Sequence, residues 1–233
     1  DYHVGTSGNS TDVVAAFVDA CRRRGVIPGL YYCTNDNHHS SKGLITRAYE
    51  DFQFAQLEEL ARDYGPIGEF WLDLPHGNSW GVRHAAYQLL AGLQPDAVII
   101  QNNGINDGSV KILPGCPCWP TDVITIETML PPSSAVEGTG YGHQAWRELP
   151  GWAIWHGGRY YLPGEVCDTV CKRWFWTEND APKSDRELLG VALLAQARGC
   201  NLLLDVGPDR HGLIPSDQVE ALGRLRRNLD RVG

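Results

Sequence analysis

Three carboxylic acids have positions along the chain that could serve catalysis. Asp73 ends a strongly apolar run that starts at residue 69, and Glu127 ends a second run over 123–127. Glu165 comes later, within a stretch rich in aromatic residues. Two carboxyl groups about 5–5.5 Å apart cleave a glycosidic bond with retention, one as nucleophile and the other as general acid and base. The three acids are candidates for such a pair, with Asp73 as the leading nucleophile.

Each acid also has a structural interpretation. Asp73 could cap the segment that follows, because Pro75 and Gly77 suit a turn. Glu127 and Glu165 both lie among apolar and aromatic residues, which raise a carboxyl pKa toward the range that a general acid needs. We expect one of the two glutamates to be the acid and base. The other would orient a loop or bind a substrate hydroxyl.

Aromatic residues are concentrated in the second half of the chain, where six of the eight tryptophans fall. Sugars present apolar C–H faces that stack on aromatic rings, whereas loops that pack on a core also use aromatic side chains. We expect most of these rings to pack and one or two to contact sugar. The candidates for sugar contact are Trp71, Trp119 and Trp174.

Metal and cofactor motifs are weak in this sequence. His38 and His39 are adjacent, so their side chains point apart, and a solvated loop is the expected setting. The seven cysteines include the pairs Cys116–Cys118 and Cys167–Cys171, whose spacings fit no zinc pattern. Neither a nucleophile elbow nor a glycine-rich nucleotide loop occurs. We therefore expect no metal and no cofactor.

Composition narrows the class of partner. A chain of 233 residues with a formal net charge of −8 suits one domain, and it disfavours nucleic acid or an anionic membrane as partner. Apolar runs stay short of the roughly 18 residues that a membrane span needs. The first residues do not resemble a leader, although one could have been removed. A soluble protein is expected, either cytoplasmic or secreted after removal of a leader.

Short apolar runs alternate with amphipathic helical patterns, which predicts an α/β fold with a largely parallel sheet covered by helices. The first helix is expected over 11–24, with Ser10 or Thr11 as its cap, and Ser216 should cap the last helix. The stretch 131–164 is rich in Gly, Trp and Pro and is expected to be irregular. Further helices are expected around 54–64, 82–93 and 185–197, and strands over 26–33, 69–73, 97–101, 123–127 and 200–206.

In α/β barrels, chemistry collects at the carboxyl ends of the strands. Polar residues occupy those ends in this chain, which favours a binding or catalytic site there. They are Tyr31, Tyr32, Asp73, Gln101, Asn102, Asn103, Glu127 and Asp205. Of these, Tyr31, Tyr32 and Asn103 are expected to bind substrate.

Three segments in order resemble the α-L-fucosidases of glycoside hydrolase family 29. Residues 12–32 resemble that family's helix and strand before its substrate tyrosine. Residues 56–73 resemble its nucleophile strand, which usually ends Trp-Phe-Asp-Gly. Residues 197–215 resemble its Gly-Gly-Asn-Leu-Leu-Leu-Asn-Val-Gly-Pro segment. The similarity covers nearly the whole chain.

The resemblance implies a retaining exo-α-L-fucosidase that acts on terminal α-L-fucosides of a glycan through a covalent fucosyl-enzyme. Asp73 matches the nucleophile, and Tyr31 matches a tyrosine of the fucose pocket. Glu127 falls where many members keep the acid and base, and Glu165 is similar to a glutamate proposed for that role in others; Glu127 is favoured. The alternatives are a weak or inert fucose-binding remnant and another retaining glycosidase.

The sequence also departs from the family pattern. Leu74 replaces the usual glycine after the nucleophile. The family's first two strands, with their histidine motif, and its C-terminal β-sandwich have no counterpart in the sequence. The expected fold is thus a single catalytic domain over 1–233, an incomplete (β/α)8 TIM-like barrel of about six strands. Open edges predict a homo-oligomer, and His3, His38 or His39 are candidates to replace the missing histidines.

Overall fold

The computed structural model describes residues 4–36, 38–39, 45–74, 77–102, 120–127, 152–155, 158–161 and 163–233. The chain divides into two compact units. The first comprises residues 1–102 and 117–121, and the second comprises residues 103–116 and 122–233. Within the described ranges, no helix has both the length and the apolar character to cross a membrane.

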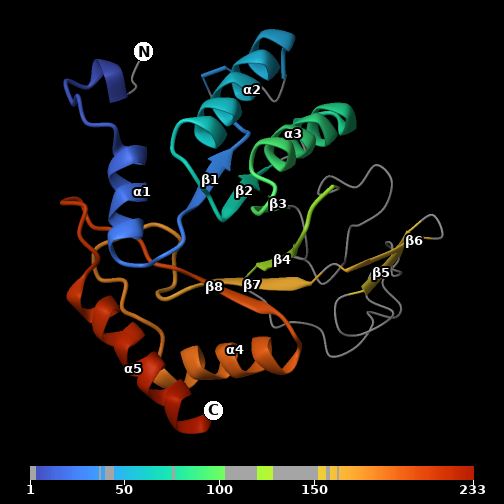
Figure 1. The fold of residues 1–233 in the computed structure, drawn as a ribbon. Helices are drawn as coiled ribbons and strands as arrows, with labels where there is room; N and C mark the ends of the chain where they lie inside the picture. Colours follow the sequence, from blue (N-terminus) through green and yellow to red (C-terminus); the bar gives the residue numbers. More distant parts are fainter. Residues whose placement is uncertain are drawn as a thin grey trace. The chain divides into compact units, whose positions relative to one another are not determined.

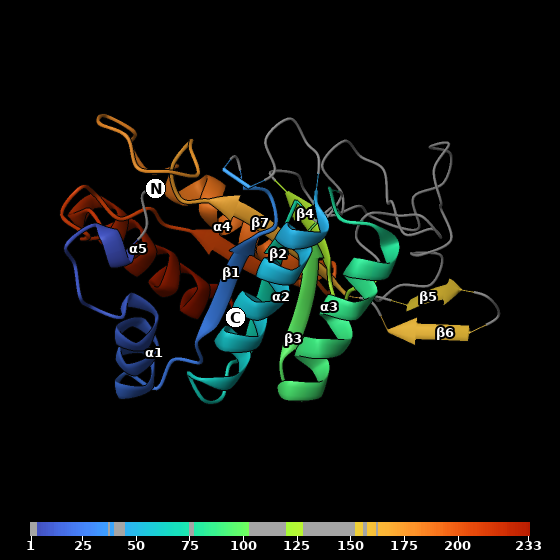
Figure 2. The ribbon, with the colours of Figure 1, turned by 90° about the horizontal axis from the view of Figure 1, so that it is seen from above.

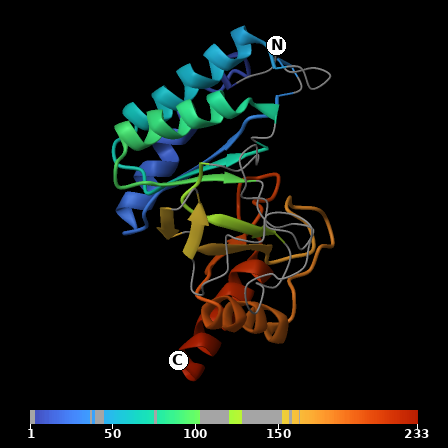
Figure 3. The same ribbon diagram turned by 90° about the vertical axis from the view of Figure 1, so that its right-hand side faces the viewer.

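The first unit is built on a parallel sheet in the order β1-β2-β3. Its strands are β1 (Gly29–Cys33), β2 (Glu69–Asp73) and β3 (Val98–Asn102). A short 3-10 turn (Val4–Thr6) precedes helix α1 (Val13–Arg23), and helices α2 (Arg47–Arg62) and α3 (Trp80–Leu93) follow β1 and β2. Figures 1 and 3 show α2 and α3 side by side on one face of this sheet.

Side chains alternate between the two faces of this sheet. Leu30, Phe70, Leu72 and Ile99 belong to a buried core shared with residues of the helices, such as Leu57. Successive side chains of a strand point to opposite faces. Tyr31, Trp71 and Asp73 are therefore on the face turned away from α2 and α3. Figure 2 shows the same three strands from above.

The second unit contains another parallel sheet, in the order β4-β7-β8. Its strands are β4 (Ile124–Glu127), β7 (Gly164–Thr169) and β8 (Asn201–Asp205). Helices α4 (Asp185–Ala197) and α5 (Ser216–Val232) pack with Leu202 and Leu204 of β8 in one core. A separate antiparallel hairpin joins β5 (Trp152–Trp155) and β6 (Gly158–Tyr161).

Helix boundaries follow local hydrogen bonding. Asp12 caps α1, its carboxylate accepting from Ala15 N, so neither Ser10 nor Thr11 has the role expected for it. The last helix also differs from expectation, because Ser216 is its first residue and Pro215 stands at the cap without a side-chain bond. Ser184 and Glu187 form a capping box at the start of α4.

Two predictions about strands need correction. The segment 131–164 was expected to be irregular, yet it contains the β5–β6 hairpin and the start of β7. Strand β7 was not expected at all, because Glu165 and Asp168 interrupt its apolar pattern. It nonetheless forms the middle strand of its sheet, where both neighbours satisfy its backbone. The described residues form two parallel sheets of three strands each, besides the β5–β6 hairpin, and a TIM-like barrel of about six strands stays a prediction.

Candidate active site

The carboxyl ends of β1, β2 and β3 bring three polar side chains together. The parallel register aligns Cys33 with Asp73, and Asp73 with Asn102, so these strand ends lie at one edge of the sheet. Tyr31 lies two residues before the end of β1, on the same face as Asp73, and is long enough to reach it. Chemistry in parallel α/β folds is usually found at such an edge.

Three donors fix the Asp73 carboxylate. The Tyr31 hydroxyl donates to Oδ2 at 2.5 Å. Asn102 Nδ2 and the Leu74 backbone N–H each donate to Oδ1 at 2.9 Å. Each donor comes from a different strand or its exit, so the position of the carboxylate depends on the alignment of all three strands.

Tyr31 forms a partly exposed wall beside the carboxylate. Its ring stacks on Trp71, with centroids 5.7 Å apart and an interplanar angle of 20°. Tyr31 is 60% exposed, whereas Trp71 is only 7% exposed. Partial burial of the phenol, followed by its bond to Asp73, raises the pKa of Tyr31 above its ordinary value. The phenol therefore keeps its proton and remains a donor to Asp73.

The backbone turn after Asp73 is unusual. Leu74 has φ +50°, in the left-handed region that favours glycine. Thr34, directly after β1, holds this turn: its N–H donates to Asp73 O at 3.0 Å. Its hydroxyl lies 2.7 Å from Leu74 O and 2.9 Å from Asp73 O.

Two of the predicted binding residues have other contacts. Tyr32 is on the helix side of β1, where its hydroxyl donates to Gln56 Oε1 at 2.8 Å and its ring packs on the core. The His38 ring meets the His39 ring edge-on at 4.7 Å. His39 in turn stacks on Tyr49 and Phe52 and lies 2.7 Å from Asp36. These positions do not bring either side chain to Asp73.

The two glutamates of the second unit lie at different levels of its sheet. Glu127 is the last residue of β4 and is aligned with Cys167, whereas Glu165 is the second residue of β7. Both are on the face opposite Leu202 and Leu204, which pack against the helices. Glu165 is 1% exposed and accepts from Asn201 Nδ2 at 2.7 Å. Burial, with the charges of Glu127 and Glu165, raises the pKa of Cys167 to about 12.

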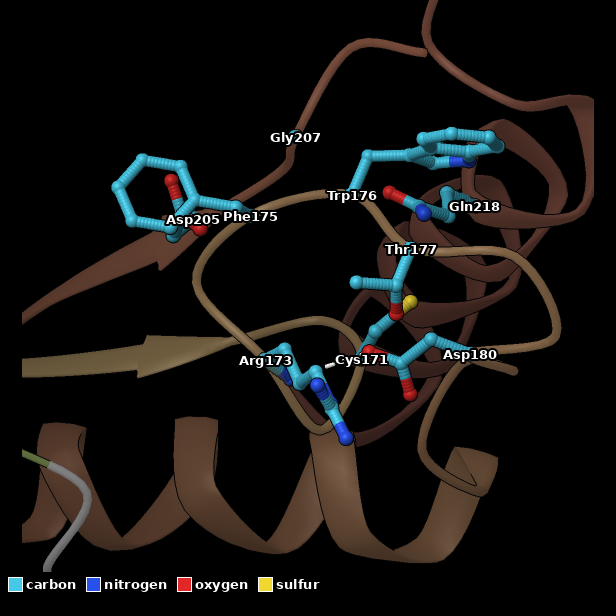
Figure 4. A pocket seen from close by; sticks show the side chains of 9 residues that line it. All are labelled: Cys171, Arg173, Phe175, Trp176, Thr177, Asp180, Asp205, Gly207 and Gln218. Carbon is cyan, nitrogen blue, oxygen red and sulfur yellow. Dashed lines mark hydrogen bonds between the residues drawn. The ribbon is translucent and has the colours of Figure 1, made fainter.

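A second group of residues surrounds the end of β8 and includes Asp205, a strand-end polar residue to which the sequence assigned no particular role. Asp205 lines a small pocket with Phe175, Trp176 and Gln218, shown in Figure 4. Its Oδ2 is buried without a hydrogen-bond partner in the described part of the chain, and burial raises the pKa of Asp205. The signal was present in the sequence, since Asp205 replaces the asparagine of the family segment.

Asn102 is a strand-end amide that contacts Asp73. Asn103, Trp119 and His3 lie outside the described residues. Trp174 is 37% exposed and does not line the pocket beside Asp205. Among the described residues, no three His, Cys, Asp or Glu side chains form a group that could hold a metal ion.

Comparisons with known proteins identify a family that this chain resembles throughout its length. The family model for alpha-L-fucosidase matches residues 1–233. Alpha-L-fucosidase 1 of Arabidopsis thaliana is 32% identical over 95% of this chain and 43% of its own length. Putative alpha-L-fucosidase 1 of Oryza sativa subsp. japonica is 29% identical over 92% of this chain and 40% of its own length. The chain thus spans about two fifths of these curated relatives.

Solved structures show the same fold. A putative alpha-L-fucosidase from Bacteroides thetaiotaomicron superposes with a TM-score of 0.71 and 27% identity, over 95% of this chain and 48% of that one. An alpha-L-fucosidase from Lactobacillus casei, in complex with alpha-L-fucose product, gives a TM-score of 0.67 and 20% identity. That match covers 95% of this chain and 65% of the Lactobacillus chain.

Proposed function

Because the chain belongs to the alpha-L-fucosidase family, we propose that it hydrolyses terminal α-L-fucosides of a glycan with retention, with Asp73 as the nucleophile. The observation that carries this proposal is the Asp73 carboxylate at the end of β2, held by Tyr31, Asn102 and Leu74 N. A nucleophile must be aimed at one carbon atom, and three donors restrict its orientation.

The proposed reaction has two displacements. In the first, a carboxylate oxygen of Asp73 attacks the anomeric carbon of fucose while the bond to the leaving oxygen breaks. The general acid gives its proton to that oxygen, and a fucosyl ester of Asp73 remains. In the second, a water molecule attacks the same carbon, the ester bond breaks, and the general base takes the proton of the water. Fucose and the free carboxylate result.

Glu127 is the proposed acid and base. It ends β4, at the edge of the second sheet where chemistry is expected. Glu165 is aligned with Thr125, two residues before Glu127, and it is buried with Asn201 as a partner. This burial suits a structural role, which supports Glu127 over Glu165.

The proposed architecture is one catalytic domain in which the parallel strands belong to a TIM-like barrel. The alternation of strands and helices in both units supports it, as does the superposition on the Bacteroides protein. Self-association also stays a proposal, and light scattering at low micromolar concentration tests it. A fully active, stable monomer would contradict the expected homo-oligomer.

Turnover of aryl glycosides tests the function. The purified chain should release the aryl group from an α-L-fucoside and not from the matching galactoside or glucoside. Asp73→Ala should abolish turnover, and azide should restore part of it with formation of the β-fucosyl azide, because azide attacks the face that Asp73 leaves open. Fucose binding without turnover would instead indicate a binding protein, and preference for another aryl glycoside a different glycosidase.

A further inference from the structure

We propose that Thr34 is a positioning residue for the Asp73 nucleophile, acting through the backbone turn at Asp73 and Leu74. The inference rests on the proposed function. Thr34 is 3% exposed and lies directly after β1, beside the end of β2. It is therefore placed to act on the backbone that carries the carboxylate, and not on the sugar itself.

Thr34 contacts the turn through two donors. Its N–H extends the β1–β2 ladder by bonding to Asp73 O at 3.0 Å. Its hydroxyl has one proton to give, and the nearer acceptor is Leu74 O at 2.7 Å, with Asp73 O at 2.9 Å. The carbonyl group of the Asp73–Leu74 peptide bond and the carbonyl group of the next peptide bond are thus both bound by a single residue.

Helix α2 fixes Thr34 in turn. Tyr49 Oη and Gln53 Nε2 both donate to Thr34 O at 3.1 Å, and both residues are 3% exposed. Gln53 Oε1 accepts from Asn78 Nδ2 at 3.0 Å. A continuous buried set of hydrogen bonds therefore leads from α2 to the nucleophile turn. Buried bonds of this kind are costly to break, so the position of Thr34 is well defined.

The turn needs this support because its conformation is strained. A leucine at φ +50° lies in the left-handed region, where its Cβ approaches the following carbonyl oxygen more closely than in the right-handed region. The Leu74 N–H donates to Asp73 Oδ1, so a relaxed turn would remove one of the three donors and redirect the carboxylate. Displacement of a reacting group by about 1 Å costs on the order of 100-fold in rate.

Thr34→Val tests the proposal, since valine keeps the shape and removes the hydroxyl. The probes are an aryl α-L-fucoside and a 2-deoxy-2-fluoro-fucosyl fluoride, which traps the nucleophile as a stable ester. The fraction of protein that becomes labelled gives the fraction of molecules with a reactive Asp73. The first-order rate constant of labelling measures the reactivity of Asp73 in those molecules. We expect Thr34→Val to lower both the kcat and the labelling rate constant about 10–100-fold with a nearly unchanged KM. Thr34→Ser should restore most of the loss.

A purely structural role for Thr34 gives a different pattern. The labelled fraction would fall while the rate constant of the labelled molecules stayed at the original value, and this outcome would overturn the proposal. If Thr34→Val does not fold, Tyr49→Phe decides the matter. That variant removes one donor to Thr34 O and should slow labelling about 2–5-fold; an unchanged rate would count against the proposal. An unsubstituted chain that is neither labelled nor active would overturn the proposed function, and this inference with it.

Discussion

At the scale of single residues, Tyr31 and Tyr32 form a matched pair on β1. They are neighbours in sequence, yet one donates to Asp73 and the other to Gln56 of α2. Removing the Tyr31 hydroxyl takes away a hydrogen bond to a carboxylate, a contribution of about 1.5–3 kcal/mol. Tyr31→Phe should therefore lower kcat/KM for an aryl α-L-fucoside about 10–100-fold.

Tyr32→Phe is the control for that experiment. It removes a hydroxyl of the same kind on the opposite face, and we expect kcat/KM to change by less than about twofold. Because the raised pKa keeps the Tyr31 phenol protonated, the Tyr31→Phe defect should be the same from pH 5 to pH 8. A larger effect of Tyr32→Phe on kcat/KM would indicate that Tyr32 binds substrate after all.

The two glutamates provide a second residue-scale prediction. Glu127→Ala should slow hydrolysis of fucosides with poor leaving groups far more than that of a dinitrophenyl fucoside, because only the former need protonation. The rates of an alkyl and a dinitrophenyl fucoside measure this difference. If Glu165→Ala shows that pattern and Glu127→Ala does not, the assignment reverses.

Glu165→Ala is expected to act on stability instead. It removes the buried acceptor of Asn201 Nδ2, and because Asn201 is exposed and can bond to water, the free energy of unfolding should fall by about 0.5–1.5 kcal/mol. Glu165→Gln, which keeps an acceptor oxygen, should cost less. Urea unfolding of both variants gives the comparison.

At the scale of elements, the backbone directly after β2 has a strained conformation at Leu74. Leu74 adopts φ +50° where the family pattern has glycine. Leu74→Gly removes a strain of about 1–2 kcal/mol but adds backbone entropy to the unfolded chain, about 0.5–1 kcal/mol. We predict a small net gain in the free energy of unfolding, up to about 1.5 kcal/mol, measured by urea unfolding.

Asn179→Gly is the matched control for Leu74→Gly. Asn179 has φ +64° and is exposed, but asparagine tolerates this region better than leucine does. The gain at Asn179 should be smaller than at Leu74, and equal gains would mean that the leucine turn is not strained.

The elements that could be predicted were those with a clear apolar period. Strands β1, β2, β3, β4 and β8 and the five α-helices of the described residues follow from the spacing of their apolar residues, although the caps expected for α1 and α5 were wrong. Strand β7 could not be predicted, because its acids are satisfied by tertiary partners: Asn201 for Glu165 and Lys183 for Asp168. Pairs of this kind join residues far apart in sequence.

Only part of the candidate site could be predicted, because its contacts also join residues far apart in sequence. A strand-end position was sufficient to single out Asp73 and Tyr31, which the structure places in contact. The sequence could not indicate that Asn102 donates to Asp73, because this contact depends on the register of β3 with β2. Thr34 shows no motif at all, and its role depends on the close approach of β1 to the turn after Asp73.

At the scale of the whole molecule, Asp205 connects pH with stability. Burial raises its pKa in the folded state, so the folded protein holds this proton more tightly than the unfolded chain. The contribution of Asp205 to the free energy of unfolding is then fully present below the ordinary aspartate pKa of about 3.9 and is lost as the pH rises through the folded-state value. Asp205→Asn should therefore stabilise the protein at pH 7 and have little effect near pH 4.

Thermal unfolding of both proteins across this range measures the difference. Asp209→Asn is a suitable control, because Asp209 lies on the surface nearby in sequence and its backbone bonds lower its pKa. Asp209→Asn should destabilise the protein at pH 7, whereas Asp205→Asn should stabilise it. A pH-independent effect of Asp205→Asn would show that its carboxyl titrates normally in the folded state.

The three donors around Asp73 also determine when the site appears during folding. Tyr31 is 42 residues before Asp73, and Asn102 is 29 residues after it. Contacts over such separations form late, since each requires a long loop to close. The helices can therefore form before Asp73 is held in a position in which it can react. Recovery of labelling after dilution from urea would follow completion of the β1-β2-β3 sheet and lag behind the recovery of helical circular dichroism.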